Sequence, residues 1–252
     1  MQPVLTLARY VLLEARRSGL GWLAVGCILI AIGAAALAAQ LAITETRELQ
    51  AATAGALLRM CAAFLIASHV VASTAREASD RGLEFALTLP ISRSQYYLGK
   101  LAGFASCAAL VATLFAFPML CWSRPAAVAA WWISLAAEGA LLAAVALFFS
   151  TALAQVVPAL VATAAFYLLG RSVSAMQAIA AGPFGGDRES TLASAVDLLG
   201  LLLPRLDRAT RTEWLVYEAP AREDWLIALA GLAIYFMVAA AAGLFDLSRR
   251  NL

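Results

Sequence analysis

Charged residues are scarce in this chain of 252 residues. Only 13% of the residues are Asp, Glu, Lys or Arg, whereas soluble domains carry about 25%. The hydrophobic fraction is 63% and the mean hydropathy is +0.84. These values exclude a soluble globular domain and predict an all-α polytopic membrane protein, with room for about six helices of roughly 20 residues each.

The chain also lacks the features of several function classes. Its net charge is only +2 and its basic residues do not form the single patch of a nucleic-acid footprint, so we expect no nucleic-acid partner. The pair Gly99-Lys100 lacks the upstream glycine of a phosphate-binding loop, which excludes a nucleotide site of that type. The cysteines show no Cys-x-x-Cys spacing and predict neither a disulfide framework nor a zinc site. They are Cys27, Cys61, Cys107 and Cys121.

Groups that could carry catalysis inside the membrane are few. The chain has no His-Glu-x-x-His or Gly-x-Ser-x-Gly motif, so we expect neither an enzyme nor a bound cofactor. The polar residues within its apolar runs include Arg59, Arg171, His69 and Glu138. Because a carboxylate at mid-membrane is costly and normally faces a partner or a water-filled cavity, Glu138 and His69 are candidates for a translocation pathway. Neutralisation of Glu138 by a neighbouring helix explains it equally well.

Four sulfur-containing residues are weak candidates for a metal site. Met60 and Cys61 lie near one end of the second apolar run, and Met119 and Cys121 lie near the corresponding end of the third. Such soft ligands suit Cu(I). Met and Cys inside apolar runs are more often packing residues, however, and no ligand triplet has a convincing spacing. The sequence therefore predicts no metal site.

Six apolar runs are long enough to span a bilayer. They are about Leu20–Thr44, Ala54–Ala75, Tyr97–Trp122, Ala127–Ser150, Val156–Met176 and Trp225–Leu247. Residues 1–18 precede them with apolar residues at helical spacing, which predicts a helix lying in the membrane interface. Basic residues gather at both termini and between residues 76 and 100, so the positive-inside rule places these parts in the cytoplasm.

Residues 177–224 are then expected outside the cell. Their apolar stretch at Leu192–Leu203 is too short to span a membrane, and Trp214, Tyr217 and Trp225 follow it. Tryptophan and tyrosine are enriched at the headgroup level of membrane proteins. We therefore expect re-entrant or interfacial helices in this segment.

The most charged part of the chain lies between the second and third runs. Five acidic or basic residues occur within nine positions, namely Arg76, Glu77, Asp80, Arg81 and Glu84. Gly82, within this cluster, and Pro90, beyond it, bound a short amphipathic stretch, because glycine and proline interrupt helices. The pattern predicts a short rigid helix in water, where it would meet a soluble protein.

These residues resemble the membrane subunits of ABC transporters of the ABC-2 class. In that family the cytoplasmic segment after the second span carries a basic-Glu pair, a glycine shortly before a glutamate, a Leu-Pro-Ile-Ser-Arg-like run and a Gly-Lys pair. This chain has Arg76-Glu77, Gly82-Leu83-Glu84, Leu89-Pro90-Ile91-Ser92-Arg93 and Gly99-Lys100. The likeness extends to the six-span layout, with a turn at Phe148–Leu153. The spacing of Gly82 and Pro90 differs from the loop of classical importers.

The resemblance implies a single transmembrane domain, residues 1–252, that pairs with a second permease copy, as a homodimer, and with two cytosolic ABC ATPases. ATP and Mg²⁺ would be bound by the ATPases, and export across the bacterial cytoplasmic (inner) membrane would follow. Residues 76–96 would form the coupling helix seated on the ATPase. Its coupling residues would be Arg76, Glu77, Gly82, Glu84, Pro90 and Arg93.

Residues 192–217 are also similar to the copper-processing permeases of the NosY group. An external accessory protein is a further candidate partner. The alternative function is a non-transporting membrane anchor that transmits the strokes of an ATPase to such a partner.

Overall fold

The computed structural model of the chain describes residues 2–41, 45–79, 92–153, 155–180, 198, 200 and 203–249. These residues are overwhelmingly helical, and no strand occurs among them. The elements are α1 (Gln2–Arg17), α2 (Leu20–Leu41), α3 (Thr46–Ser79), α5 (Arg93–Met119), α6 (Pro125–Leu153), α7 (Val156–Ala180), η1 (Leu206–Arg208), α9 (Glu213–Val216) and α10 (Arg222–Arg249).

Six of these helices are long and apolar enough to cross a membrane. They are α2, α3, α5, α6, α7 and α10, and they match the six predicted spans. The all-α polytopic fold class is therefore confirmed. No membrane is part of the structure, so the orientation of the bundle and the position of α1 relative to lipid stay predictions.

Several helices run further than the hydropathy pattern predicts. Helix α3 continues to Ser79 and α5 begins at Arg93, so both ends of the predicted coupling segment are the last and first turns of long helices. Helix α6 continues to Leu153. The turn predicted at Phe148–Leu153 is therefore wrong, because an apolar run without glycine or proline has nothing to interrupt the helix.

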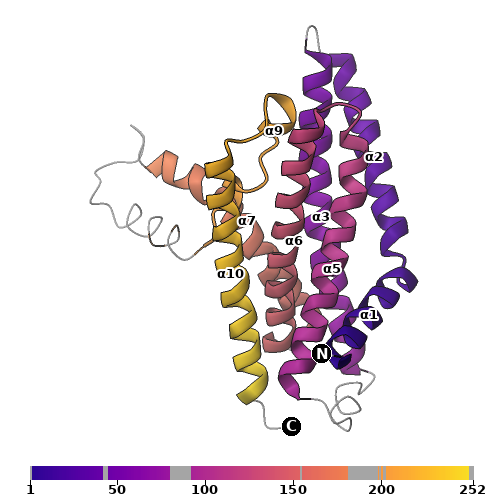
Figure 1. Cartoon of the computed structure of the whole chain (residues 1–252), viewed down its shortest axis with the longest axis vertical. Coiled ribbons are helices and arrows are strands. Elements are labelled where there is room, and N and C mark those ends of the chain that lie inside the picture. Colours follow the sequence, from indigo (N-terminus) through magenta and orange to yellow (C-terminus); the bar gives the residue numbers. More distant parts are fainter. Residues whose placement is uncertain are drawn as a thin grey trace.

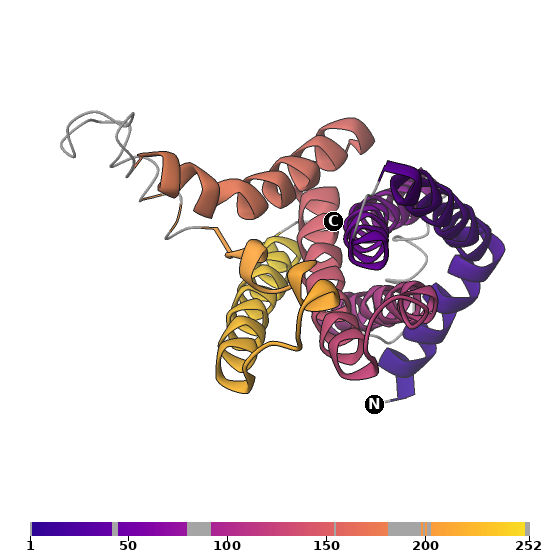
Figure 2. The same ribbon diagram turned by 90° about the horizontal axis from the view of Figure 1, so that it is seen from above.

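Helix α6 lies at the centre of the bundle. It packs against α5, α3, α7 and α10, and the view from above shows α7 and α10 on one side of it and α1, α2, α3 and α5 on the other (Figure 2). Both chain termini lie at one end of the molecule, and α9 lies toward the opposite end (Figure 1). We call these the terminal end and the α9 end.

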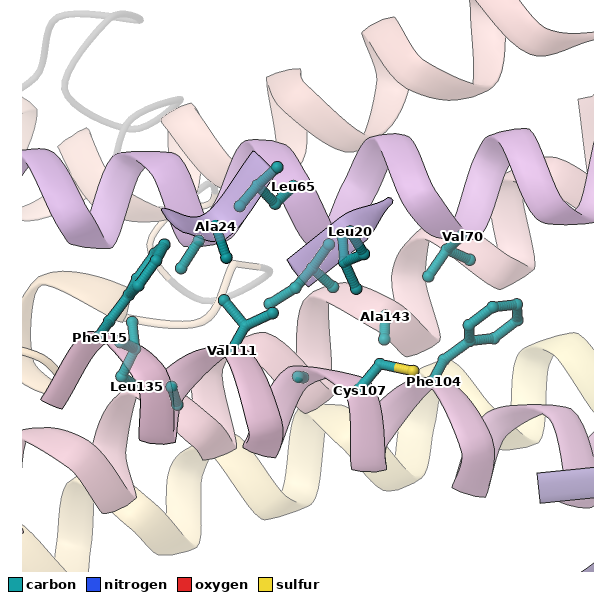
Figure 3. Packing of buried hydrophobic residues seen from close by; sticks show 14 of the residues in the cluster. Leu20, Ala24, Leu65, Val70, Phe104, Cys107, Val111, Phe115, Leu135 and Ala143 are labelled. Atoms are coloured by element: carbon teal, nitrogen blue, oxygen red, sulfur yellow. The ribbon is translucent and has the colours of Figure 1, made fainter. Parts of the chain in front are cut away.

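The interior of the larger group of helices is built on one stripe of α5. Phe104, Cys107, Val111 and Phe115 recur every three or four residues and are buried, which places them on one helix face. They pack among residues of α2, α3 and α6 that include Leu20, Leu65 and Ala143 (Figure 3). Small side chains on α6 allow this close packing, as is usual for helices in membranes.

Helix α1 packs against α5 and not only against its successor. A Cβ atom added at Gly103 would lie 2.6 Å from Cβ of Val11, and one added at Gly99 would lie 2.8 Å from Cβ of Leu7. The two glycines therefore permit contact between the helix backbones. Gly19, with a φ of 78°, makes the turn from α1 to α2, a conformation that glycine adopts without steric cost.

The outer helices present apolar side chains to their surroundings. In the most apolar 18-residue stretch of α2, and likewise of α10, only 17% of the residues are buried. Residues such as Trp22, Leu29, Ile227 and Met237 are exposed. Exposed apolar area of this extent is expected for helices that contact lipid, and it is rare on soluble monomers.

Candidate functional sites

A buried ion pair joins α3 to α5 at the terminal end. The Glu77 carboxylate pairs with the Lys100 ammonium and accepts a hydrogen bond from the Tyr96 hydroxyl. Lys100 is only 6% exposed, and its ammonium lies 5.5 Å from the ring centroid of Tyr96 and 5.9 Å from that of Phe104. A buried ammonium needs such a partner, since its desolvation is costly. We call Glu77, Tyr96 and Lys100 the terminal-end clamp.

Three further contacts tie the same helix ends to α1 and α10. The Arg76 guanidinium lies 3.1 Å from Glu14 of α1, and the Ser73 hydroxyl donates to the same carboxylate at 2.8 Å. At the start of α5, Arg93 donates to the backbone carbonyl of Leu247 at 3.4 Å. The helices on either side of residues 80–91 are thus fixed to each other and to the first and last helices of the chain.

The start of α5 is also capped. The Ser92 hydroxyl accepts from the backbone N–H of Gln95, and the Gln95 side chain accepts from the backbone N–H of Ser92. This capping box satisfies two backbone donors that a helix start leaves unpaired. The Leu-Pro-Ile-Ser-Arg run therefore ends in a firm helix start at Ser92.

Three predicted coupling residues are placed by these contacts, and three are not. Arg76, Glu77 and Arg93 all form intramolecular interactions at the terminal end. Gly82, Glu84 and Pro90 lie outside the described residues. Arg76 and Glu77 lie on α3 itself, and of the three residues Arg76 alone is exposed, at 53% of its side chain.

A second polar cluster surrounds Glu138 in the middle of α6. The Glu138 residue is 3% exposed, and its carboxylate accepts a hydrogen bond from the Thr210 hydroxyl. Nη1 of Arg171 on α7 lies 3.4 Å from the same carboxylate. Burial of this carboxylate is compensated by an ion pair and a hydrogen bond, as the cost of a charge inside a bundle requires.

The arginines of this cluster bind a segment that folds back into the bundle. Arg171 donates to the backbone carbonyls of Leu206 at 2.9 Å and Thr210 at 2.7 Å. Arg59 on α3 donates to the Thr210 carbonyl at 2.9 Å and to the Thr212 hydroxyl at 3.0 Å. We call Glu138, Arg171 and Arg59 the central clamp and Leu206–Val216 the re-entrant segment.

The re-entrant segment is buried on its inner side. Leu206, Ala209, Thr210, Trp214 and Leu215 are all buried. At the α9 end, the Ser123 hydroxyl donates to the Leu215 carbonyl at 2.7 Å. The regular structure of this segment is limited to the short helices η1 and α9. Side chains from α3, α7 and the α5–α6 connection donate hydrogen bonds to its backbone carbonyls, as buried backbone polar groups require.

The two candidates for a translocation pathway are not brought together. Glu138 belongs to the central clamp, whereas His69 lies toward the terminal end, edge-on to Phe104 with 5.9 Å between the ring centroids. Among the described residues nothing hydrogen-bonds its buried Nε2 atom. His69 therefore packs among apolar side chains of α3 and α5, and only Glu138 forms part of a polar site.

The four candidate metal ligands also differ in their exposure. Met60 is 43% exposed, Met119 is fully buried, Cys121 is exposed in the turn after α5, and Cys61 on α3 is half-buried. Within the ranges that the structure describes, no three His, Cys, Asp or Glu residues gather as metal ligands would. Nothing in their geometry favours a metal site.

The sequence identified Arg59, Glu138 and Arg171 as polar residues in apolar runs, but it did not pair them. Thr210 was missed altogether, because a threonine in a polar loop carries no signal of burial. One pattern could have indicated the burial of Leu206 and Ala209, though not that of Thr210: Arg205, Arg208 and Arg211 alternate with these two residues at a spacing of three, which predicts one buried face and one polar face.

No protein-family model matches the chain, and no curated protein matches it significantly.

Proposed function

We propose that the chain is the membrane-spanning permease subunit of an ABC transporter of the ABC-2 class, and that it couples ATP hydrolysis by a partner ATPase to export across the bacterial inner membrane. The observation that carries the proposal is the terminal-end clamp. It fixes the two helix ends from which residues 80–91 depart, and those residues contain the family-like Gly-Leu-Glu and Leu-Pro runs.

A coupling segment transmits force only if its base does not yield. Glu77 with Lys100 links α3 to α5, Glu14 with Arg76 links α3 to α1, and Arg93 links α5 to α10. A push delivered to residues 80–91 would therefore reach four helices at once. In this proposal the terminal end faces the cytoplasm, α1 lies in the membrane interface, and residues 76–96 dock on the ATPase.

In the proposed coupling, the central clamp connects the same helices to the external side. It joins α3 and α7 to the re-entrant segment, which lies on the external side in the proposed orientation. Because α3 carries Arg59 and also Arg76 and Glu77, movement of this single helix would connect the ATPase side to the external segment. The proposed assembly contains two permease copies and two ATPases.

The test is co-purification of the tagged chain from its native membranes. We expect a soluble ATPase with a phosphate-binding loop to accompany the chain, and Glu84→Lys to reduce its recovery by about tenfold while the chain itself accumulates normally. The matched control is Glu218→Lys, the same charge change at a side chain that is 83% exposed at the α9 end. Recovery of the wild-type chain without any ATPase contradicts the proposal.

A further inference from the structure

A cavity separates the re-entrant segment from α10 at the α9 end. Its volume is about 650 Å³. One wall carries three guanidinium groups, those of Arg205, Arg208 and Arg211, and the opposite wall is the apolar side of α10. Neither clamp lines this cavity, so it is a separate feature of the molecule.

The arginine wall is held in place from behind. Leu206 and Ala209 are buried in the bundle and Thr210 is bound by the central clamp, whereas Arg205, Arg208 and Arg211 are exposed. All three arginines line the same cavity, Arg208 from the last position of η1 and the other two from the backbone on either side of that turn. The three cations are thus presented together by a backbone that is already fixed.

The described part of the chain balances the positive charge of this wall only in part, since Asp207, between Arg205 and Arg208, forms no ion pair there and its buried Oδ1 atom has no hydrogen-bond partner there. The only carboxylate there that lines the cavity is Asp224, and the only ion pair there formed by the three arginines joins Arg211 to Glu213 at 3.9 Å. Thr210 contacts Glu138 in the middle of α6, so Arg208 lies well inside the length of the spans. Cations at that depth require an anion or water.

The opposite wall has the character of a site for a hydrocarbon chain. It is formed by Ile227, Ala228, Gly231 and Leu232, with Tyr235 beyond them. From Asp224 to Tyr235 a helix rises by about 16 Å, at about 1.5 Å per residue. A Cβ atom added at Gly231 would meet nothing within 4 Å, so the wall is open at this position.

We propose that this cavity binds an anionic amphiphile, with its phosphate group on Arg205 and Arg208 and its chain along α10. Guanidinium groups suit this ligand because they donate two parallel hydrogen bonds to phosphate oxygens. The two walls of opposite character favour an amphiphile over a free phosphate ion. The inference requires neither the ATPase nor transport, so a failure of the proposed function would not contradict it.

The experiment measures thermal unfolding of the full chain in a neutral detergent with three additives. They are short-chain phosphatidylglycerol, short-chain phosphatidylcholine and inorganic phosphate. We expect phosphatidylglycerol to raise the unfolding midpoint in a saturable manner, and the other two to leave it unchanged. If inorganic phosphate alone raises the unfolding midpoint by the full amount, the ligand need not be an amphiphile. If phosphatidylcholine raises the midpoint equally, the ligand need not be an anion. Either result overturns the proposal.

Two variants and one control locate the effect. Arg205→Gln combined with Arg208→Gln should raise the half-saturating concentration of phosphatidylglycerol at least about tenfold, as loss of charged hydrogen bonds predicts. Gly231→Leu should do so without any change of charge, by filling the apolar wall. Arg222→Gln removes an exposed arginine at the start of α10 that does not line the cavity. It should bind as the wild type does; equal loss in this control contradicts the site.

Discussion

At the scale of the residue, the central clamp depends on one carboxylate. Glu138 is the shared partner of the Arg171 guanidinium and the Thr210 hydroxyl. Removing one member of a buried ion pair is more damaging than replacing both, because the remaining charge is left without compensation. The cost of a change at Glu138 therefore depends on what is left to face Arg171.

We expect Glu138→Ala to lower the free energy of unfolding by about 3–5 kcal/mol, the range for breaking a buried ion pair. Glu138→Gln should cost less, because its amide oxygen still accepts from Thr210. Thermal or denaturant unfolding in detergent measures both. Glu218→Ala, at an ion pair whose side chains are 80% and 83% exposed and 4.0 Å apart, should be neutral. An unchanged stability of Glu138→Ala would show that the clamp is dispensable.

The same residue shows where prediction from sequence stops. A carboxylate in an apolar run indicates that a partner exists, but Arg59 and Arg171 are 79 and 33 positions away in the chain, and several pairings are consistent with hydropathy. Thr210 carries no signal at all. The identity of the partners depends on tertiary packing, which a single sequence does not encode in local pattern.

At the scale of the element, α1 is positioned by two glycines of α5. Their missing side chains let the helix backbones approach at Gly99 and Gly103, so α1 is attached to the bundle along its length. Through Glu14, α1 also holds Arg76 near the proposed coupling segment. Displacing α1 should therefore loosen the terminal end.

Gly103→Leu should displace α1 and lower stability by about 1–3 kcal/mol, the usual cost of overpacking, since even a Cβ atom there would lie 2.6 Å from Val11. Hydrogen exchange should show faster exchange throughout α1. The control is Gly26→Leu on α2, where an added Cβ meets nothing within 4 Å. Unaltered exchange in α1 of the Gly103 variant would refute the close approach.

The helices themselves were largely predictable. Long apolar runs specify α2, α3, α5, α6, α7 and α10 because each is long enough to span a bilayer. The ends of these helices were not predictable from the apolar runs. Helix α3 continues through the polar residues Arg76 and Glu77, because Arg76 forms an ion pair with Glu14 and Glu77 forms one with Lys100. The expectation of re-entrant or interfacial helices within residues 177–224 stays a prediction, because most of the apolar stretch 192–203 lies outside the described residues.

At the scale of the whole molecule, orientation determines every functional statement. Basic residues at the terminal end, among them Arg16 and Arg17, favour a cytoplasmic position for that end. Cysteine labelling tests this in a background free of the four native cysteines. We expect a cysteine at the exposed Ser79 to be shielded from an impermeant reagent in intact cells, and one at Glu218 to react. The reverse labelling pattern contradicts the orientation.

The central claim is that residues 80–91 contact an ATPase, and photo-crosslinking measures that contact directly. A photoreactive residue is placed at Glu84, and an identical one at Glu218 of the α9 end is the matched control. The account predicts an adduct from position 84 to a soluble protein that contains a phosphate-binding loop and hydrolyses ATP, and none from position 218. Efficient activation at position 84 with adducts only to lipid, or to proteins without a nucleotide site, would contradict it.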